Sequence, residues 1–363
     1  MALKLWPVDG LARALAAERA NDPEFGRPNP KLARAEAIRA LERQPILPRA
    51  VRVLGFLADQ PGNSGRARPL MNLAARLTRR DIHTELWLIN DLSAQGKTAA
   101  TLAHYDIALR TGGLSNAVLF PILSSAMNDA ELVGPISDLL AKRPPWINEF
   151  LAMVITSAQV PANFADLART IAARGVPVDK RISAMIVDRY ARDGRYDAAW
   201  RYFGTLVGPE QRSASVRDPK FIATAAGFEP FNWHVASLGD MNASTGEATP
   251  GLVIEGTSVD AAVAWQLLHL APGNFVARVL AEVRGPSGSQ VALTLTCATS
   301  PEREIGKIAL TPGKPAVGRA SYSFTLPPGC PFQWLRVAAR SGMDQPMTAQ
   351  IAELNISAAG SRQ

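Results

Sequence analysis

Apolar residues between about 31 and 208 recur with the three- and four-residue spacing of amphipathic helices. Glycines and prolines interrupt this pattern at short intervals, as they do at connections between helices. Prolines stand where helices have to end, which predicts one pair of helices over 116–142 and another over 146–174. The pattern therefore indicates an all-α region with short connections.

The predicted helices repeat with a period of about 34 residues, because Gly62 aligns with Gly96 and Ala74 with Ala108. The glycine stands where one helix turns into the next, and the alanine stands where two helices approach closely. This repetition predicts an α-helical solenoid of about five diverged helix pairs over residues 31–211.

The repeated positions resemble those of the tetratricopeptide repeat family. The matching residues are Leu54, Gly55, Ala58, Gly62, Ala67, Met71 and Ala74 in one copy, Leu88, Leu92, Gly96, Tyr105 and Ala108 in the next, and Tyr190, Gly194, Ala199 and Phe203 in a later one. The resemblance covers about residues 31–208 and implies a superhelix whose concave groove holds a segment of a partner protein. We expect Glu85, Asn90 and Tyr190, on or near the first helices of their pairs, to line that groove.

After residue 219 the spacing of apolar residues changes to the alternation of β-strands. The predicted strands cover 275–283, 291–297, 305–310, 320–326, 333–339 and 350–356. Glycine- and proline-rich turns separate these strands, which is typical of an antiparallel β-sandwich of the jelly-roll kind.

The predicted fold class is therefore multidomain, α then β. The predicted domains are an N-terminal helix or tail over 1–30, the tetratricopeptide-like solenoid over 31–211 and the sandwich over 219–363. The short polar side chains of 212–219 are typical of a linker, so we expect that segment to be exposed.

The sandwich region resembles the carbohydrate-binding-module-like jelly rolls that are appended to bacterial repeat proteins. The stretches that carry the resemblance are 231–233, 267–273, 329–335 and 351–356. The resemblance implies a glycan-binding surface, on which the flat face of an aromatic ring stacks on a sugar. We expect the sandwich tryptophans Trp233, Trp265 and Trp334 to fill the core between the sheets, with Trp233 and Tyr322 as the candidates to reach a glycan instead.

The net charge of +7 lies within residues 1–218, because acidic and basic residues balance in the rest of the chain. Five arginines form a basic patch in this part of the sequence: Arg66, Arg68, Arg76, Arg79 and Arg80. Such a patch attracts an anionic partner such as an acidic glycan, phospholipid headgroups or nucleic acid, or it is a solvated surface. Since no recognisable nucleic-acid-binding module accompanies the patch, we expect no nucleic-acid partner.

The only two cysteines, Cys297 and Cys330, both fall in the predicted sandwich. Cys297 alternates with apolar residues toward the inner face of its strand, and a disulfide to Cys330 would close a loop of about 33 residues. The alternative is two unrelated thiols in a reducing compartment. Since disulfides persist in oxidising compartments, the pair favours the periplasm or the cell envelope.

No apolar run approaches the ~20 residues that a membrane-spanning helix needs. Residues 1–30 lack the continuous apolar stretch of a signal peptide. We therefore expect neither a membrane span nor an export signal in this sequence.

The sequence contains no recognisable catalytic or metal-binding motif. The four histidines, at positions 83, 104, 234 and 269, lack metal-ligand spacing, and the sequence has no nucleophile elbow or phosphate-binding loop. We therefore expect no metal, no cofactor and no catalysis.

The favoured interpretation is a non-catalytic scaffold and binding protein. The family resemblances imply a place in the bacterial cell envelope, assisting the assembly or export of an exopolysaccharide. Two alternatives stay open. One is a carbohydrate-active enzyme, a glycoside hydrolase or lyase, with a sandwich binding module, and the other is a protein-binding repeat protein with a purely structural β cap.

Overall fold

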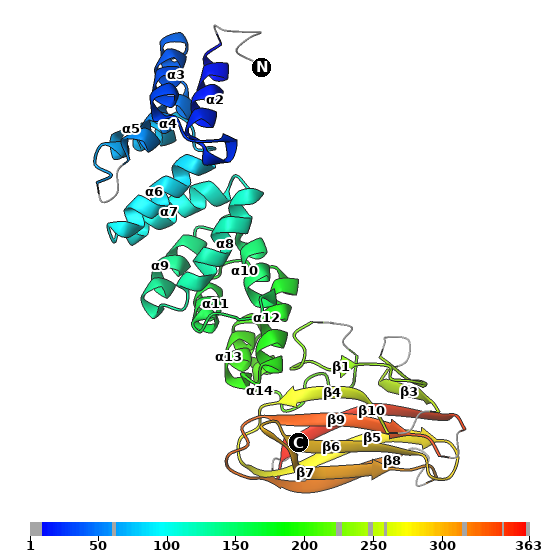
Figure 1. Cartoon of the computed structure of the whole chain (residues 1–363). Helices are drawn as coiled ribbons and strands as arrows, with labels where there is room; N and C mark the ends of the chain where they lie inside the picture. Colours follow the sequence, from blue (N-terminus) through cyan, green and yellow to red (C-terminus); the bar gives the residue numbers. More distant parts are fainter. Residues whose placement is uncertain are drawn as a thin grey trace. The chain divides into compact units, whose positions relative to one another are not determined.

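The computed structural model describes residues 9–59, 63–222, 227–245, 250–257, 260–313, 318–342 and 345–360. The chain divides into two compact units, Met1–Pro177 and Val178–Gln363. Figure 1 shows helices along the first unit and, in the second, a few helices followed by strands.

The first unit is built from helices that pack on helices close to them in the sequence. They are α2 (Gly10–Asn21), the short 3-10 helix η1 (Pro23–Phe25), α3 (Pro30–Arg43), α4 (Pro48–Ala58), α5 (Ala67–Leu77), α6 (Ile82–Ala94), α7 (Thr98–Leu109), α8 (Leu114–Ala126), α9 (Ala130–Leu140), α10 (Ile147–Thr156) and α11 (Phe164–Ala173). Successive helices from α2 to α8 contact one another, after which α10 packs on α8 and α11 on α9. The predicted helix pairs over 116–142 and 146–174 are confirmed as α8–α9 and α10–α11.

At the repeated positions that the structure describes stand a turn glycine and two buried alanines. Gly96, between α6 and α7, has a φ of +68°, a backbone conformation that residues with a Cβ rarely adopt. Ala74 and Ala108 are fully buried. Gly62 lies outside the described residues. The assignment of these helices to the tetratricopeptide family stays a prediction.

In its described residues, the second unit contains three helices and a β-sandwich. The helices are α12 (Lys180–Arg192), α13 (Tyr196–Leu206) and α14 (Pro209–Ser213). The strands are β1 (His234–Val235), β2 (Met241–Ser244), β3 (Leu252–Gly256), β4 (Ala261–Leu268), β5 (Gly273–Arg284), β6 (Gln290–Cys297), β7 (Ser300–Leu310), β8 (Gly318–Leu326), β9 (Gln333–Arg340) and β10 (Met347–Ala358).

The strands form two five-stranded antiparallel sheets. One has the order β1-β4-β9-β6-β7 and the other the order β2-β3-β10-β5-β8. Their inner faces supply one apolar core, in which Val263, Val337 and Ile351 are fully buried. The predicted order of helices followed by an antiparallel sandwich is confirmed.

The segment 212–219, expected to be an exposed linker, is partly buried. Val216 is 5% exposed and Arg217 is 6% exposed. The Arg217 backbone N–H donates to the side-chain carbonyl of Gln266 in β4, and the carbonyl of Pro219 accepts from the N–H of Leu354 in β10. The expectation of exposure is therefore wrong at Val216 and Arg217, because this segment packs against both sheets.

Candidate functional site

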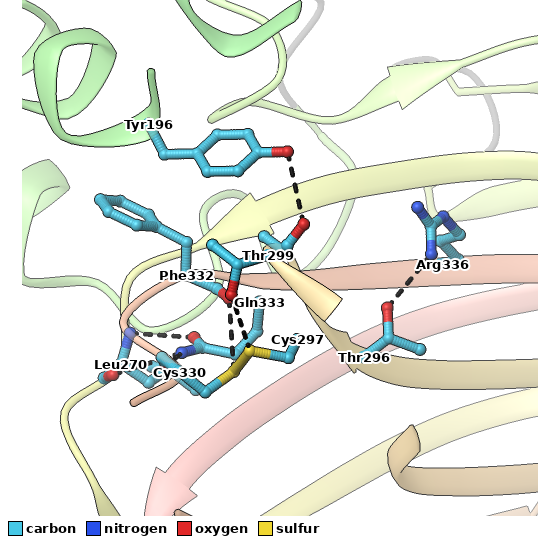
Figure 2. The surroundings of a disulfide bond; sticks show 10 residues. Tyr196, Leu270, Thr296, Cys297, Thr299, Cys330, Phe332, Gln333 and Arg336 are labelled. Atoms are coloured by element: carbon cyan, nitrogen blue, oxygen red, sulfur yellow. Dashed lines mark hydrogen bonds between the residues drawn. A yellow bond between two sulfur atoms is a disulfide. The ribbon is translucent and has the colours of Figure 1, made fainter. Parts of the chain in front are cut away.

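The predicted disulfide between Cys297 and Cys330 is present, with the Cα atoms 5.6 Å apart. It joins the end of β6 to the loop that precedes β9, and both residues are 1% exposed. Beside it, the Gln333 side-chain carbonyl accepts a hydrogen bond from the N–H of Leu270 at 3.1 Å (Figure 2). This buried network fixes the start of β9, the central strand of its sheet.

We call the side of the β1-β4-β9-β6-β7 sheet that points away from the sandwich core the outer face. Strand pairing places one residue of each strand in a single row across it, in the order His234, Trp265, Arg336, Thr294 and Lys307. Arg336 alternates along β9 with Leu335 and Val337, which belong to the core, so the row points away from the core. The outer face therefore carries an aromatic ring among charged and hydroxyl side chains.

A second row on the outer face consists of Leu267, Trp334, Thr296 and Glu304, of which Leu267 and Thr296 are buried. Arg336 ties the two rows together, since its guanidinium lies 5.5 Å from the Trp334 ring centroid and donates to the Thr296 hydroxyl at 3.2 Å (Figure 2). Burial lowers the pKa of Arg336 from its ordinary value, and interaction with Tyr196 partly opposes this shift. Arg336 is thus held in place between the two rows.

His234 stacks on Trp265, with ring centroids 4.1 Å apart and an interplanar angle of 25°. Its Nδ1 lies 2.7 Å from the Glu229 carboxylate. The rings of Trp334 and of Tyr196, from α13, are nearly perpendicular, with 6.3 Å between their centroids. Both tryptophans are therefore oriented by neighbours while staying partly exposed.

Two of the three sandwich tryptophans lie outside the core in which they were expected. Trp265 and Trp334 were expected in the core, yet both lie on the outer face and neither packs against the core cluster. Trp233 is packed against that core, as favoured from the sequence; it donates to the Asp218 carbonyl at 3.2 Å, and its ring centroid lies 4.8 Å from that of Phe221. It also lines a cavity of about 460 Å³.

Tyr322 does not share a surface with Trp233. It lies on β8, at the edge of the other sheet, and its side chain is on the same face of the strand as that of Phe324, a core residue. A Cβ added to Gly306 of β7 would lie 2.8 Å from the Tyr322 ring, so the ring covers the core where β7 and β8 meet. The two residues expected to bind a glycan therefore do not form one site.

Two of the three expected groove residues are buried. Glu85 is 1% exposed and its Oε2 lies 2.6 Å from Nδ1 of His104, while Tyr190 is fully buried with the guanidinium of Arg195 over its ring. Neither side chain is available to a partner, so that prediction is wrong for both. Asn90 is exposed.

The predicted basic patch divides into one paired arginine and four exposed ones. Two nitrogens of Arg68 donate to the Asp91 carboxylate, Nε at 2.8 Å and Nη2 at 3.0 Å. This hydrogen bonding raises the pKa of Arg68. The exposed arginines are Arg66, Arg76, Arg79 and Arg80.

Among the residues that the structure describes, no three His, Cys, Asp or Glu side chains lie where they could hold a metal ion. No helix in the same residues is both long enough and apolar enough to cross a membrane.

Comparison with known proteins finds no matching family model and no matching curated protein. Among solved structures, TmCBM61 in complex with β-1,4-galactotriose is similar at 12% identity and a TM-score of 0.29, over 40% of this chain and 99% of that one. A carbohydrate-binding module from Cellvibrio mixtus lichenase 5A in complex with cellotriose is similar at 14% identity and a TM-score of 0.24, over 34% of this chain and 92% of that module. The family 22 carbohydrate-binding module of Clostridium thermocellum Xyn10B is similar at 13% identity and a TM-score of 0.26, over 40% of this chain and 93% of that module. Likenesses this low do not transfer a function to this chain.

Proposed function

We propose that this chain is a non-catalytic polysaccharide-binding protein whose sandwich holds the sugar chain against the outer face. The observation that carries the proposal is the position of Trp265 and Trp334, two large and partly exposed aromatic side chains on the outer face rather than in the core. Apolar surface that is rimmed by polar groups in this way typically marks an interaction site.

The chemistry of the outer face fits a sugar chain. A sugar ring has an apolar C–H face, which a tryptophan face complements, and a rim of hydroxyl groups that donate and accept hydrogen bonds. Arg336 and Lys307 supply donors, Glu304 supplies acceptors, and Thr294 supplies both. With strands ~4.8 Å apart, the row across the five strands spans about 19 Å, which suits an extended chain rather than a single sugar.

The disulfide supports the cellular part of the proposal. A buried pair such as Cys297–Cys330 is typical of proteins that fold in an oxidising compartment. We therefore place the protein in the bacterial cell envelope, where it assists exopolysaccharide assembly or export. The helical unit serves as the scaffold for a protein partner in that role.

The proposal is tested by affinity electrophoresis of the full chain through gels that contain neutral or acidic polysaccharides. We expect at least one polysaccharide to retard the native protein, and Trp265→Ala to weaken its apparent affinity about tenfold, because the stacking surface is lost. Arg336→Gln, which keeps both rings, is expected to weaken binding as well.

Tyr322→Ala is the matched control, since it removes an exposed aromatic ring from the edge of the other sheet. It is expected to leave retardation unchanged. If Trp265→Ala migrates like the native protein in every gel, or if no polysaccharide retards the native protein, the proposal is wrong.

A further inference from the structure

A cavity of about 600 Å³ lies in the first compact unit, where the α5–α6 connection meets the end of α7. Its lining residues are Arg79, Arg80, Asp106, Ile107, Arg110 and Thr111. The volume falls within the ~300–1,000 Å³ of ordinary ligand sites, which are mostly apolar. Because charged and polar side chains dominate this lining, the cavity suits a polar, charged ligand.

The cavity carries an excess of positive charge. Its one carboxylate, Asp106, is already engaged, since it accepts from Arg110 Nε at 3.0 Å and from Trp146 Nε1 at 3.0 Å. The side chains of Arg79 and Arg80 are exposed and make no hydrogen bond or ion pair within the part of the chain that the structure describes. Two guanidinium groups therefore have their donors available to a ligand.

The lining residues discriminate between classes of anionic ligand. Guanidinium groups bind carboxylates through paired, parallel hydrogen bonds. A single-stranded nucleic acid needs aromatic rings on which its bases stack, and none of the six lining residues is aromatic. A protein segment is held mainly by apolar anchors in buried pockets, and Ile107 is the one large apolar side chain of the lining. A glycan that carries acid groups needs neither feature.

We propose that this cavity binds the carboxylate groups of an acidic polysaccharide through Arg79 and Arg80, beside the Arg110–Asp106 ion pair. The site is separate from the outer face of the sandwich, because it belongs to the other compact unit and uses different residues. Loss of either site leaves the other testable by its own substitutions. Sulfate esters share the same oxyanion chemistry, so the test includes them.

The test is a titration of the full chain with polygalacturonate oligomers at low and at moderate salt. Arg79→Gln together with Arg80→Gln is expected to weaken binding about tenfold or more, because two charge-assisted contacts are lost. The matched control is Arg66→Gln together with Arg76→Gln, which removes the same charge from exposed arginines outside the cavity. It is expected to change the affinity less than about threefold, through long-range attraction alone.

Each parallel titration decides one point. Equal losses in the two double variants would overturn the proposal in favour of diffuse attraction, and absence of polygalacturonate binding to the native chain would overturn it outright. If poly-glutamate binds as tightly through Arg79 and Arg80, the proposed glycan is wrong and the ligand is an acidic protein segment. If a sulfated glycan binds more tightly than polygalacturonate, the group that the cavity recognises is a sulfate ester and not a carboxylate. Weak binding of neutral galactan, unchanged in either double variant, supports the proposal.

Discussion

At the scale of single residues, the Cys297–Cys330 disulfide restrains the start of a central strand. Cys330 lies three residues before Gln333, whose side chain hydrogen-bonds the Leu270 backbone, so the bridge and this buried glutamine hold the same turn. Because both sulfur atoms belong to buried residues, the bridge is protected from exchange in the folded protein.

We predict that loss of this bridge lowers the free energy of unfolding by about 3–4 kcal/mol, the chain-entropy value for a loop of this length. The measurement is denaturant unfolding of the native protein, of the reduced protein and of Cys330→Ser. Cys297→Ala combined with Cys330→Ala is the control, since it leaves no unpaired thiol. Protein isolated from an oxidising compartment with both thiols open to alkylation before unfolding would contradict the prediction.

The side-chain alternation along β9 could have placed Trp334 from the sequence. Trp334 and Arg336 alternate with Leu335 and Val337, so one pair had to face solvent once the strand was identified. Trp265 could not be placed in the same way. The pairing of β4 with β9 shifts between Ala262 and Ala264, and such an irregularity reverses the face of every later side chain.

At the scale of elements, the strands from residue 273 on were predictable and the earlier ones were not. The six predicted strands are confirmed as β5 to β10, and turns that contain glycine or proline separate most of them. β4 was missed, since its Ala-Ala-Val-Ala-Trp-Gln-Leu-Leu sequence is nearly continuously apolar and carries the pairing shift. β3 was missed because it has five residues.

Arg217 connects α13 to the sandwich inside the second unit. Its guanidinium lies 4.9 Å from the ring centroids of both Trp200 and Phe203 and donates to the Phe231 carbonyl at 2.9 Å. Burial lowers its pKa to about 10, so it stays a cation at neutral pH. The sequence alone could not predict these contacts of Arg217, because Trp200, Phe203 and Phe231 come together only in the folded chain.

Arg217→Ala is predicted to destabilise the second unit by about 2–4 kcal/mol, because the cation–π contacts and a charged hydrogen bond are both lost. The measurement is thermal and denaturant unfolding of the full chain. Lys220→Ala, an exposed cation three residues along, is the control and is expected to change stability by less than about 0.5 kcal/mol. Equal effects of the two substitutions would show that Arg217 does not hold the helix to the sheet.

At the scale of the whole molecule, helices and strands do not define the compact units. The change from helix to strand falls between α14 and β1, whereas the units divide after Pro177. Contacts such as Trp200 on Phe231 and Tyr196 on Phe332 group α13 with the sandwich. The period of 34 residues could not predict the division after Pro177, because it defines helix pairs but does not indicate which pair packs against a sheet.

The central claim is that the outer face of the β1-β4-β9-β6-β7 sheet holds a polysaccharide, and residue-resolved oxidative footprinting tests it most directly. The full chain is exposed to hydroxyl radicals with and without a polysaccharide that retards it in gels, and oxidation of each tryptophan is measured by mass spectrometry. We predict that the polysaccharide protects Trp265 and Trp334, while Trp87, in the first unit, and Trp233, packed against the core, keep their oxidation rates. Protection of Trp233 with unchanged oxidation of Trp265 and Trp334 would contradict the claim and move the glycan to the cavity that Trp233 lines.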